Sequence, residues 1–411
     1  MLAAFCCAPV FGERNDGVMD ISRLIADRAQ AVDASGIRRI FQLGAQIENP
    51  INLSIGQPDF PVPEPIKRAA IDAIENDQNG YTQTQGIAPL REKLEAWLST
   101  DLGWSFGSAG DPEVLVTTGT SGALFLAFLA LMGPGDEAII PDPYFVMYPH
   151  IATMCGGKAI RCDTYPDFRM TAERVEPLIT ERTKLVLYNA PSNPAGVVGS
   201  VDECRELLEL CRRKGVLLIS DEIYDEFTFD DFESDTTVGE PKKPRCPSPA
   251  RFPGAEEDVL VIRGFGKTYG VTGWRMGYAV GPAELIGHIA KFQQYTYVCA
   301  PSIAQHGCIA AMDVDMQPTV AKYKQRRDHL VEALRQWTDV AVPGGAFYLF
   351  PRAPEGITGT AFVERAIERK LLVIPGGIFS ERDTHFRISF AASEDNIARG
   401  IEVLGDLFSG I

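Results

Sequence analysis

The sequence lacks the features that mark several classes of protein. Its nine cysteines include no Cys-x-x-Cys pair, which argues against a zinc module. No apolar run reaches the roughly 18 residues of a membrane-spanning helix. Acidic residues outnumber basic ones, and the net charge of −16 leaves little basic surface for a nucleic acid. The scattered cysteines favour reduced thiols. We therefore predict a cytoplasmic protein without a metal, membrane or nucleic-acid partner.

The N-terminus lacks the basic region that precedes the apolar stretch of a secretion signal. We predict that residues 1–18 form a disordered tail. The chain of 411 residues is long enough for two domains, and its hydrophobic content of 45% is ordinary for a globular protein.

Short apolar runs alternate with helical patterns through the middle of the chain. The runs are continuous rather than alternating, as in strands that are buried on both faces. Helical patterns such as residues 121–131 and 201–214 fill the gaps. This order predicts an α/β fold with a mostly parallel sheet. The five runs are residues 114–116, 138–140, 185–188, 217–220 and 259–263.

Two segments depart from this alternation. Residues 232–258 contain five prolines and several charges, which predicts a surface loop. From about Pro301 the chain has long helical patterns, followed by strand-like residues 345–350 and 386–390. These predict a smaller α+β domain.

Reactive side chains follow all five apolar runs. Ligands of α/β sheets bind beyond the carboxyl ends of the strands, so these side chains are expected to meet in one site. The ends supply hydroxyls, an aromatic ring, an amide, a carboxylate and an amine. The residues in question are Thr120, Ser121, Phe145, Asn193, Asp221, Tyr224 and Lys267.

Lys267 directly follows a predicted buried strand, whereas most lysines are solvated surface charges. A desolvated lysine loses proton affinity and becomes a nucleophile or a base. Two other motifs compete for the same residues. A phosphate-binding P-loop would need glycine at Val261. A dinucleotide-binding turn would need a helix next, and Gly270 and Gly273 disfavour one.

Asp221 is either the cap of a helix or a carboxylate that faces the ring nitrogen of pyridoxal phosphate. In the second case it keeps that nitrogen protonated. Tyr224 and Asn193 can donate hydrogen bonds to the phenolic oxygen of the same cofactor. Asn193 is equally compatible with a turn before Pro194.

Gly119, Thr120 and Ser121 begin a predicted helix, where free backbone N–H groups bind phosphate or a hydroxyl simply caps the helix. Arg275 can add a charge-assisted contact to that phosphate. Arg387 lies in an apolar strand, where arginine needs an anionic partner. That partner is a substrate carboxylate or, alternatively, a structural salt bridge.

Taken together and in order, these motifs resemble the class I and II aminotransferases, which have the pyridoxal-phosphate-dependent transferase fold of type I. The resemblance covers nearly the whole chain, from about Ser35 to the C-terminus. It rests on residues 53–60 (LSIGQPDF), 80–91 (GYTQTQGIAPLR), 189–196 (NAPSNPAG), 221–224 (DEIY), 267–277 (KTYGVTGWRMG) and 386–391 (FRISFA).

The resemblance implies a role for each matching residue. Lys267 binds pyridoxal phosphate as a Schiff base and moves the proton during catalysis, and Asp221 pairs with the pyridine nitrogen. The further cofactor contacts are Gly119, Thr120, Ser121, Phe145, Asn193, Tyr224 and Arg275. The substrate contacts are Gly56, Asn193 and Arg387. Tyr81 matches a tyrosine that reaches the phosphate of a neighbouring subunit, which implies a homodimer with shared sites.

The resemblance also implies how the chain is divided. Residues 19–65 form an N-terminal segment that packs with the small domain, residues 66–300 form the large cofactor-binding domain, and residues 301–411 form the small domain. One departure stands out: many members have serine three residues before the lysine, where this chain has Gly264. One hydroxyl contact to the phosphate is then missing, unless Thr268 or another group replaces it.

The predicted activity is transfer of an amino group from an L-amino acid to a 2-oxo acid, with 2-oxoglutarate as the expected acceptor. An elimination or lyase reaction on the same cofactor is the alternative, and a non-catalytic regulator is a third reading. The N-terminal segment near residues 37–41 is expected to contribute to substrate choice. A dicarboxylate substrate would need a second cation, and the sequence identifies none.

Overall fold

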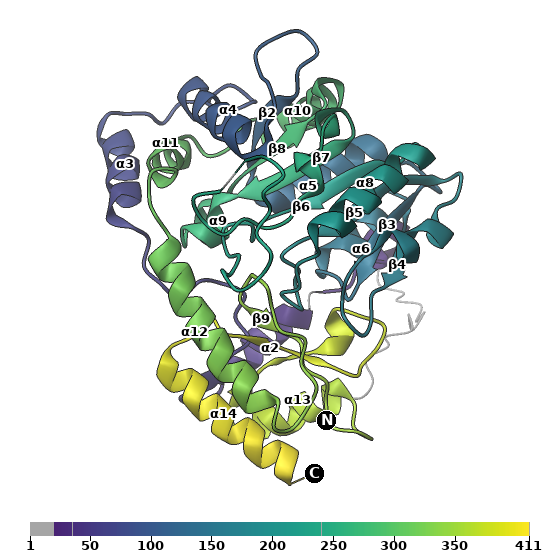
Figure 1. The fold of residues 1–411 in the computed structure, drawn as a ribbon, viewed down its shortest axis with the longest axis vertical. Coiled ribbons are helices and arrows are strands. Elements are labelled where there is room, and N and C mark those ends of the chain that lie inside the picture. The colour runs from purple at the N-terminus through teal and green to yellow at the C-terminus, as the bar shows by residue number, and fades with distance from the viewer. Residues whose placement is uncertain (1–19, 35, 240, 411) are drawn as a thin grey trace.

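The computed structural model describes residues 20–34, 36–239 and 241–410, so the predicted tail at residues 1–18 lies outside the described residues. Figure 1 shows a large layered domain around a sheet and a smaller domain built on α12, α13 and α14. The strands are β1 (Ile51–Asn52), β2 (Glu113–Thr118), β3 (Glu137–Asp142), β4 (Lys158–Asp163), β5 (Thr183–Asn189), β6 (Leu217–Asp221), β7 (Val259–Gly264), β8 (Met276–Gly281), β9 (Tyr348–Leu349), β10 (Leu371–Leu372), β11 (Ile374–Pro375) and β12 (Phe386–Ser389).

Helices surround these strands. The α-helices are α1 (Asp27–Gln30), α2 (Gly36–Gly44), α3 (Glu64–Glu75), α4 (Ala88–Leu102), α5 (Gly119–Leu131), α6 (Met147–Met154), α7 (Ala172–Val175), α8 (Val201–Lys214), α9 (Phe265–Thr268), α10 (Ala283–Thr296), α11 (Ser302–Ala311), α12 (Gln317–Leu334), α13 (Gly359–Glu368) and α14 (Glu394–Ser409). The 3₁₀ helices are η1 (Ile21–Leu24), η2 (Glu176–Leu178), η3 (Pro249–Arg251), η4 (Ala255–Glu257), η5 (Thr272–Trp274) and η6 (Gly376–Ile378).

The central sheet has seven strands in the order β2-β8-β7-β6-β5-β3-β4. Strand β8 is antiparallel to both of its neighbours, and the other pairs are parallel. The predicted α/β fold with a mostly parallel sheet is therefore confirmed. All five predicted runs are strands of this sheet. The sequence analysis did not identify β4 and β8, because β4 is a half-exposed edge strand with charged residues and β8 contains two glycines.

Both faces of the sheet are covered, which explains why the apolar runs are continuous. Along β2, Val114 and Val116 belong to the core cluster on one face, and Leu115 belongs to the cluster on the other. Successive side chains of a strand point to opposite faces, so a strand buried on both sides needs an apolar residue at every position.

Helix α8 shows how local sequence signals set the connections between strands. The Ser200 hydroxyl accepts from the Glu203 backbone N–H, and the Glu203 carboxylate accepts from the Ser200 backbone N–H, which forms a capping box. Gly215 ends the helix in the left-handed conformation, with φ of 65°. These signals return the chain to the sheet at β6, whose last residue is Asp221.

The N-terminal segment joins the small domain. β1 pairs in parallel with β10, and Ile40 of α2 packs in a cluster with Leu372 and Ile374. The remaining strands form an antiparallel sheet in the order β11-β12-β9. The strand predicted at residues 345–350 was too long, because Gly345 lies against the Phe227 carbonyl and Ala346 has a φ of 57°. Only Tyr348–Leu349 is a strand.

Helix α11 packs against α3 and α4, and its Ala304, Cys308 and Ala311 belong to the core of the large domain. Val320 is the first residue of α12 that belongs to the core of the small domain. The predicted limits of the domains stay a prediction, and we propose a boundary after α11 instead of at residue 301.

The proline-rich segment at residues 232–258 is only partly the surface loop that its composition predicts, because its first part reaches the surface and a later stretch does not. Residues 246–251 are buried. Arg251 pairs with Asp101 at 3.0 Å and with Asp235 at 2.9 Å, and Arg263 of β7 pairs with Asp101 and with Glu222, each at 2.8 Å. Buried charges need such partners, so this ion network anchors the segment behind the carboxyl end of β6.

Candidate active site

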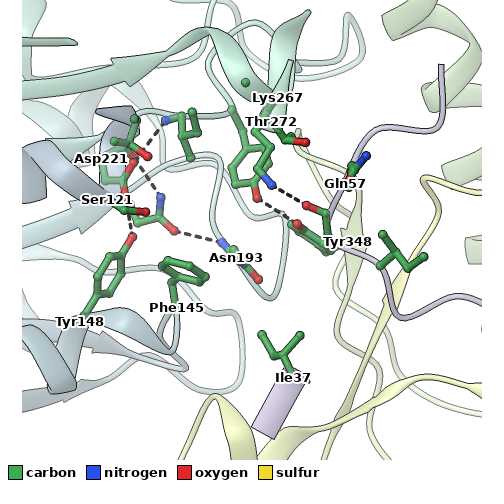
Figure 2. A pocket seen from close by; sticks show the side chains of 18 of the residues that line it. Ile37, Gln57, Ser121, Phe145, Tyr148, Asn193, Asp221, Lys267, Thr272 and Tyr348 are labelled. Carbon is green, nitrogen blue, oxygen red and sulfur yellow. Dashed lines mark hydrogen bonds between the residues drawn. The ribbon is translucent and has the colours of Figure 1, made fainter. Parts of the chain in front are cut away.

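A cavity of about 350 Å³ lies at the carboxyl ends of the parallel strands, between the two domains. Its lining includes all the predicted site residues except Tyr81 (Figure 2). The lining residues are Ile37, Ile55, Gly56, Gln57, Gly119, Thr120, Ser121, Phe145, Tyr148, Asn189, Asn193, Asp221, Ile223, Tyr224, Gly266, Lys267, Thr272, Arg275, Met276, Tyr348 and Arg387.

Lys267 projects from α9, just after β7, into this cavity. Its Nζ donates a hydrogen bond to the Gly56 carbonyl and lies 5.9 Å from the ring centre of Tyr224 and 6.0 Å from that of Phe347. Burial, followed by the positive charges of Arg387 and Arg275, lowers the pKa of Lys267 from 10.5 to about 8. An appreciable fraction of this amine is therefore neutral and nucleophilic near neutral pH.

Asp221 is buried, with 2% of its surface exposed. Its carboxylate accepts hydrogen bonds from the Tyr148 hydroxyl at 2.8 Å and from the Ile223 backbone N–H at 3.3 Å. Burial raises the pKa of Asp221 to about 6. No described lysine or arginine forms an ion pair that would lower it again. A buried carboxylate in this state is suited to a cationic nitrogen that enters the cavity.

Two asparagines connect the main chain of Asp221 to Arg387. The Asn189 side-chain amide donates to the Asp221 carbonyl at 2.9 Å, and its oxygen accepts from the Asn193 backbone N–H at 3.0 Å. The Asn193 Oδ1 in turn accepts from Arg387 Nη1 at 2.9 Å. No hydrogen-bond partner within the described residues is found for Asn193 Nδ2, which leaves it available to donate to a bound molecule.

Arg387 lies on β12 and is 1% exposed. Its Nη2 donates to the Ser54 carbonyl at 3.0 Å, and its guanidinium lies 4.5 Å from the ring centre of Tyr348 and 4.7 Å from that of Phe379. Burial lowers the pKa of Arg387. No carboxylate in the described part of the chain pairs with it, so the alternative of a structural salt bridge finds no support.

Tyr224 connects the cavity to the small domain. Its ring packs in the core of the small domain, and its hydroxyl lies 2.9 Å from that of Tyr348. Sequence reasoning missed Tyr348, Tyr148 and Asn189. Asn189 begins the quoted NAPSNPAG motif and offered a signal, whereas the two tyrosines have no local pattern that distinguishes them from core residues.

The start of α5 forms a concave cradle. Gly119 has a φ of 69°, and a Cβ there would lie 2.5 Å from the Arg275 guanidinium. A Cβ on Gly277 would lie 2.7 Å from the Thr120 backbone nitrogen. Both positions therefore require glycine, and together they bring a guanidinium against the free N–H groups of a 13-residue helix. An arrangement of this kind is suited to phosphate.

The structure explains why Gly264 replaces the expected serine. A Cβ at Gly264 would lie 2.9 Å from Ile223 Cδ1 and 3.0 Å from Thr120 Cγ2, so neighbouring side chains already fill that space. Thr268, the suggested substitute, lines a different and smaller cavity. Thr272 lines the main cavity instead.

Tyr81 lies outside the cavity and is 87% exposed.

Within the described residues, no helix has the length and apolar character to cross a membrane. The same residues contain no group of three or more histidine, cysteine or acidic side chains arranged to hold a metal ion.

The cavity fits pyridoxal phosphate at three separate points. Asp221 is a buried carboxylate that no described lysine or arginine pairs with, the start of α5 offers a cradle suited to phosphate, and Lys267 is an amine with a lowered pKa. The fold and the site define a pyridoxal-phosphate-dependent transferase of fold type I.

Known proteins of the same architecture identify the family. The family described as aminotransferase class I and II matches residues 48–404, and the chain belongs to it. The chain is 35% identical over 402 residues to the aspartate aminotransferase of Rhizobium meliloti, covering 91% of this chain and 94% of that protein. It is therefore a pyridoxal-phosphate-dependent aminotransferase.

Solved structures agree with this assignment. The aspartate aminotransferase of Thermotoga maritima superposes with a TM-score of 0.86 at 30% identity, covering 94% of this chain and 100% of that one. The aromatic aminotransferase of Pyrococcus horikoshii OT3 superposes with a TM-score of 0.83 at 28% identity, covering 93% and 98%. These neighbours have different named substrates, so the likeness does not decide the amino donor.

Proposed function

We propose that Lys267 holds pyridoxal phosphate, that Asp221 pairs with its ring nitrogen, and that Arg387 binds the α-carboxylate of the substrate. The reaction transfers the amino group of an L-amino acid to a 2-oxo acid, with 2-oxoglutarate as the acceptor. One observation carries this proposal: a single cavity contains an amine with a lowered pKa, a buried carboxylate and a buried guanidinium, and neither of the last two has an oppositely charged partner among the described residues.

The remaining cavity residues complete the binding site. Gly119, Thr120, Ser121 and Arg275 would hold the phosphate, Tyr224 and Asn193 the phenolic oxygen, and Phe145 the face of the ring. When bound, the cofactor withdraws electrons from the substrate α-carbon and so makes its proton acidic. Gly56 and Asn193 lie beside Arg387 and would help to orient the carboxylate.

Lys267 is the group that would move the proton. Its lowered pKa keeps part of the amine neutral, so Nζ would accept the proton from the α-carbon and pass it on to the bound cofactor. The bond to the Gly56 carbonyl holds Nζ next to the segment that approaches Arg387. Because Arg387 fixes the carboxylate, the α-carbon is presented to Nζ in one orientation.

The direct test is the absorption spectrum of the purified protein, followed by borohydride reduction and peptide mapping. A visible cofactor band and a label on Lys267 are expected, and incubation with amino donors and 2-oxoglutarate should give 2-oxo acids without ammonia. A colourless protein that takes up no cofactor would refute the proposal. Release of ammonia or pyruvate would replace transamination with an elimination reaction.

Acylation of the cofactor-free protein should show the lowered pKa of Lys267. Only the neutral amine reacts, so the rate of modification should rise about tenfold for each pH unit below 8 and level off above it. Trace acetic anhydride and mass spectrometry of the Lys267 peptide measure this rate, with the surface lysine Lys184 as the comparison. A rate that still rises steeply above pH 10 would contradict the assignment.

Replacing Arg387 with methionine should lower kcat/KM for the amino donor about 10²-fold or more, mainly through a higher KM. The loss of a buried charge-assisted contact to a carboxylate costs about 2–5 kcal/mol. Arg399→Met on the exposed face of α14 is the control and should change nothing. An unchanged KM in the Arg387→Met enzyme would show that the carboxylate binds elsewhere.

We also propose a homodimer in which Tyr81 reaches the phosphate of the partner's cofactor. The exposed aromatic residues Tyr81 (87%) and Tyr295 (86%) support an additional interface. Sedimentation should give twice the mass of the chain, and Tyr81→Ala should weaken cofactor binding without separating the subunits.

The seven described cysteines are all free, which supports the proposed cytoplasmic location.

A further inference from the structure

One part of the cavity is used by none of the contacts proposed above. Ile37 of α2 and Gln57, which follows β1, line the cavity across from Asp221 (Figure 2), and Ile55 lines the same cavity. The phosphate cradle, the ring contacts and Arg387 use the polar residues on the other sides of the cavity that the proposed function names. The space beside these three residues is therefore free to receive a substrate side chain.

The walls of this space are aliphatic. Ile37 and Ile55 are both partly buried and present branched hydrocarbon surface to the cavity. Among the described residues that line the cavity, the charged side chains are Asp221, Lys267, Arg275 and Arg387, and each already has a proposed partner. Burying an apolar side chain against such walls is favourable, whereas a carboxylate there loses hydration without gaining a cation from the described lining.

Gln57 gives the same space one polar group. Its side chain is exposed at the mouth of the cavity, and its amide has no hydrogen-bond partner in the described residues. A neutral amide can donate to a carboxylate that reaches the mouth, and it imposes no buried charge when an apolar side chain occupies the space.

We propose, building on the aminotransferase function above, that the amino donor has an uncharged apolar side chain such as that of leucine, methionine or phenylalanine. Ile37 and Ile55 hold this side chain. Gln57 donates a hydrogen bond to the second carboxylate of 2-oxoglutarate in the other half of the reaction. One site thus accepts two different side chains, because the apolar walls lie inside and the amide lies at the mouth.

The first test compares amino donors with the intact holoenzyme and 2-oxoglutarate. Leucine, methionine or phenylalanine should exceed aspartate in kcat/KM by about tenfold or more, since side-chain pockets discriminate by roughly this factor for each small group. Aspartate equal to or better than all three would overturn this inference and leave the aminotransferase function intact. If no donor gives a 2-oxo acid, both the inference and the proposed function fail.

The second test separates the two halves of the pocket. Ile37→Ala and Ile55→Ala should each lower kcat/KM for leucine about tenfold and change that for alanine less. Gln57→Ala should raise KM for 2-oxoglutarate about tenfold with little change for leucine, and Gln57→Glu should raise it further through repulsion. Ile71→Ala, at an exposed position of α3, is the matched control.

The cofactor spectrum of each variant shows that the fold is retained. The inference is overturned if Gln57→Ala leaves the KM for 2-oxoglutarate and the KM for leucine unchanged, or raises both equally. It is also overturned if the isoleucine variants affect leucine and alanine to the same extent.

Discussion

Replacing Lys267 with alanine is expected to lower the rate of transamination by about 10⁴-fold or more, the effect of removing a group that is both nucleophile and general base. The phosphate cradle and Asp221 do not depend on the lysine, so the variant should still bind pyridoxal phosphate, which borohydride would no longer attach to the chain. Steady-state rates with and without added methylamine measure the effect. A small amine should restore part of the activity, because it replaces the missing base in the cavity.

The control for this experiment is Lys184→Ala, which removes a surface lysine that pairs with Asp136 at 3.7 Å. It should have the activity of the unchanged protein. A Lys267→Ala enzyme that keeps a tenth of its activity would show that another group moves the proton.

Replacing Asp221 with asparagine should lower activity about 10³-fold while leaving the cofactor-free protein equally or more stable. The loss of activity follows from removing the charge that would stabilise a protonated ring nitrogen, and preorganised charges of this kind contribute factors of this size. The stability result follows from burial, since the carboxylate is 2% exposed and no described cation forms an ion pair with it.

The effect on stability should depend on pH. The pKa of Asp221 is raised from 3.8 to about 6 in the folded protein. The folded state therefore binds more protons than the unfolded state between these values, and the unchanged protein loses stability as the pH rises from about 4 to 6. Over about two pKa units, this loss is at most about 3 kcal/mol.

Thermal unfolding of the cofactor-free proteins measures this difference. At pH 4 the two proteins should have similar Tm values, and at pH 8 the Asp221→Asn protein should have the higher one. Asp202→Asn, at an exposed position of α8, is the control. An Asp221→Asn protein that is less stable at pH 8 would mean that a cation compensates the carboxylate.

Most of the candidate site could be predicted because it is built from strand ends. Continuous apolar runs identify strands that are buried on both faces, and the carboxyl ends of parallel strands meet at one edge. Asp221 ends β6 and Lys267 follows β7, so their proximity follows from topology. Asn193 shares the cavity for the same reason, because it follows β5.

The sequence was misleading where composition did not reflect environment. The five prolines of residues 232–258 suggest a surface loop, yet Arg251 and Arg263 bind acidic side chains beneath it and bury its second half. Ion pairs between distant segments leave no periodic signal, and only the packed structure reveals them.

The sequence by itself determined the family, the cofactor, and the identity of the lysine, the aspartate and the arginine at the centre of the site. Those residues lie in short motifs whose spacing is set by single strands and turns. Only the tertiary structure showed that Tyr148 and Asn189 hold Asp221, that Thr120 and Ile223 fill the space of the serine missing at Gly264, and that Ile37 and Gln57 line the same cavity as Lys267. These contacts join segments far apart in the chain, so their geometry is decided by how the strands of the central sheet, its helices and the N-terminal segment come together.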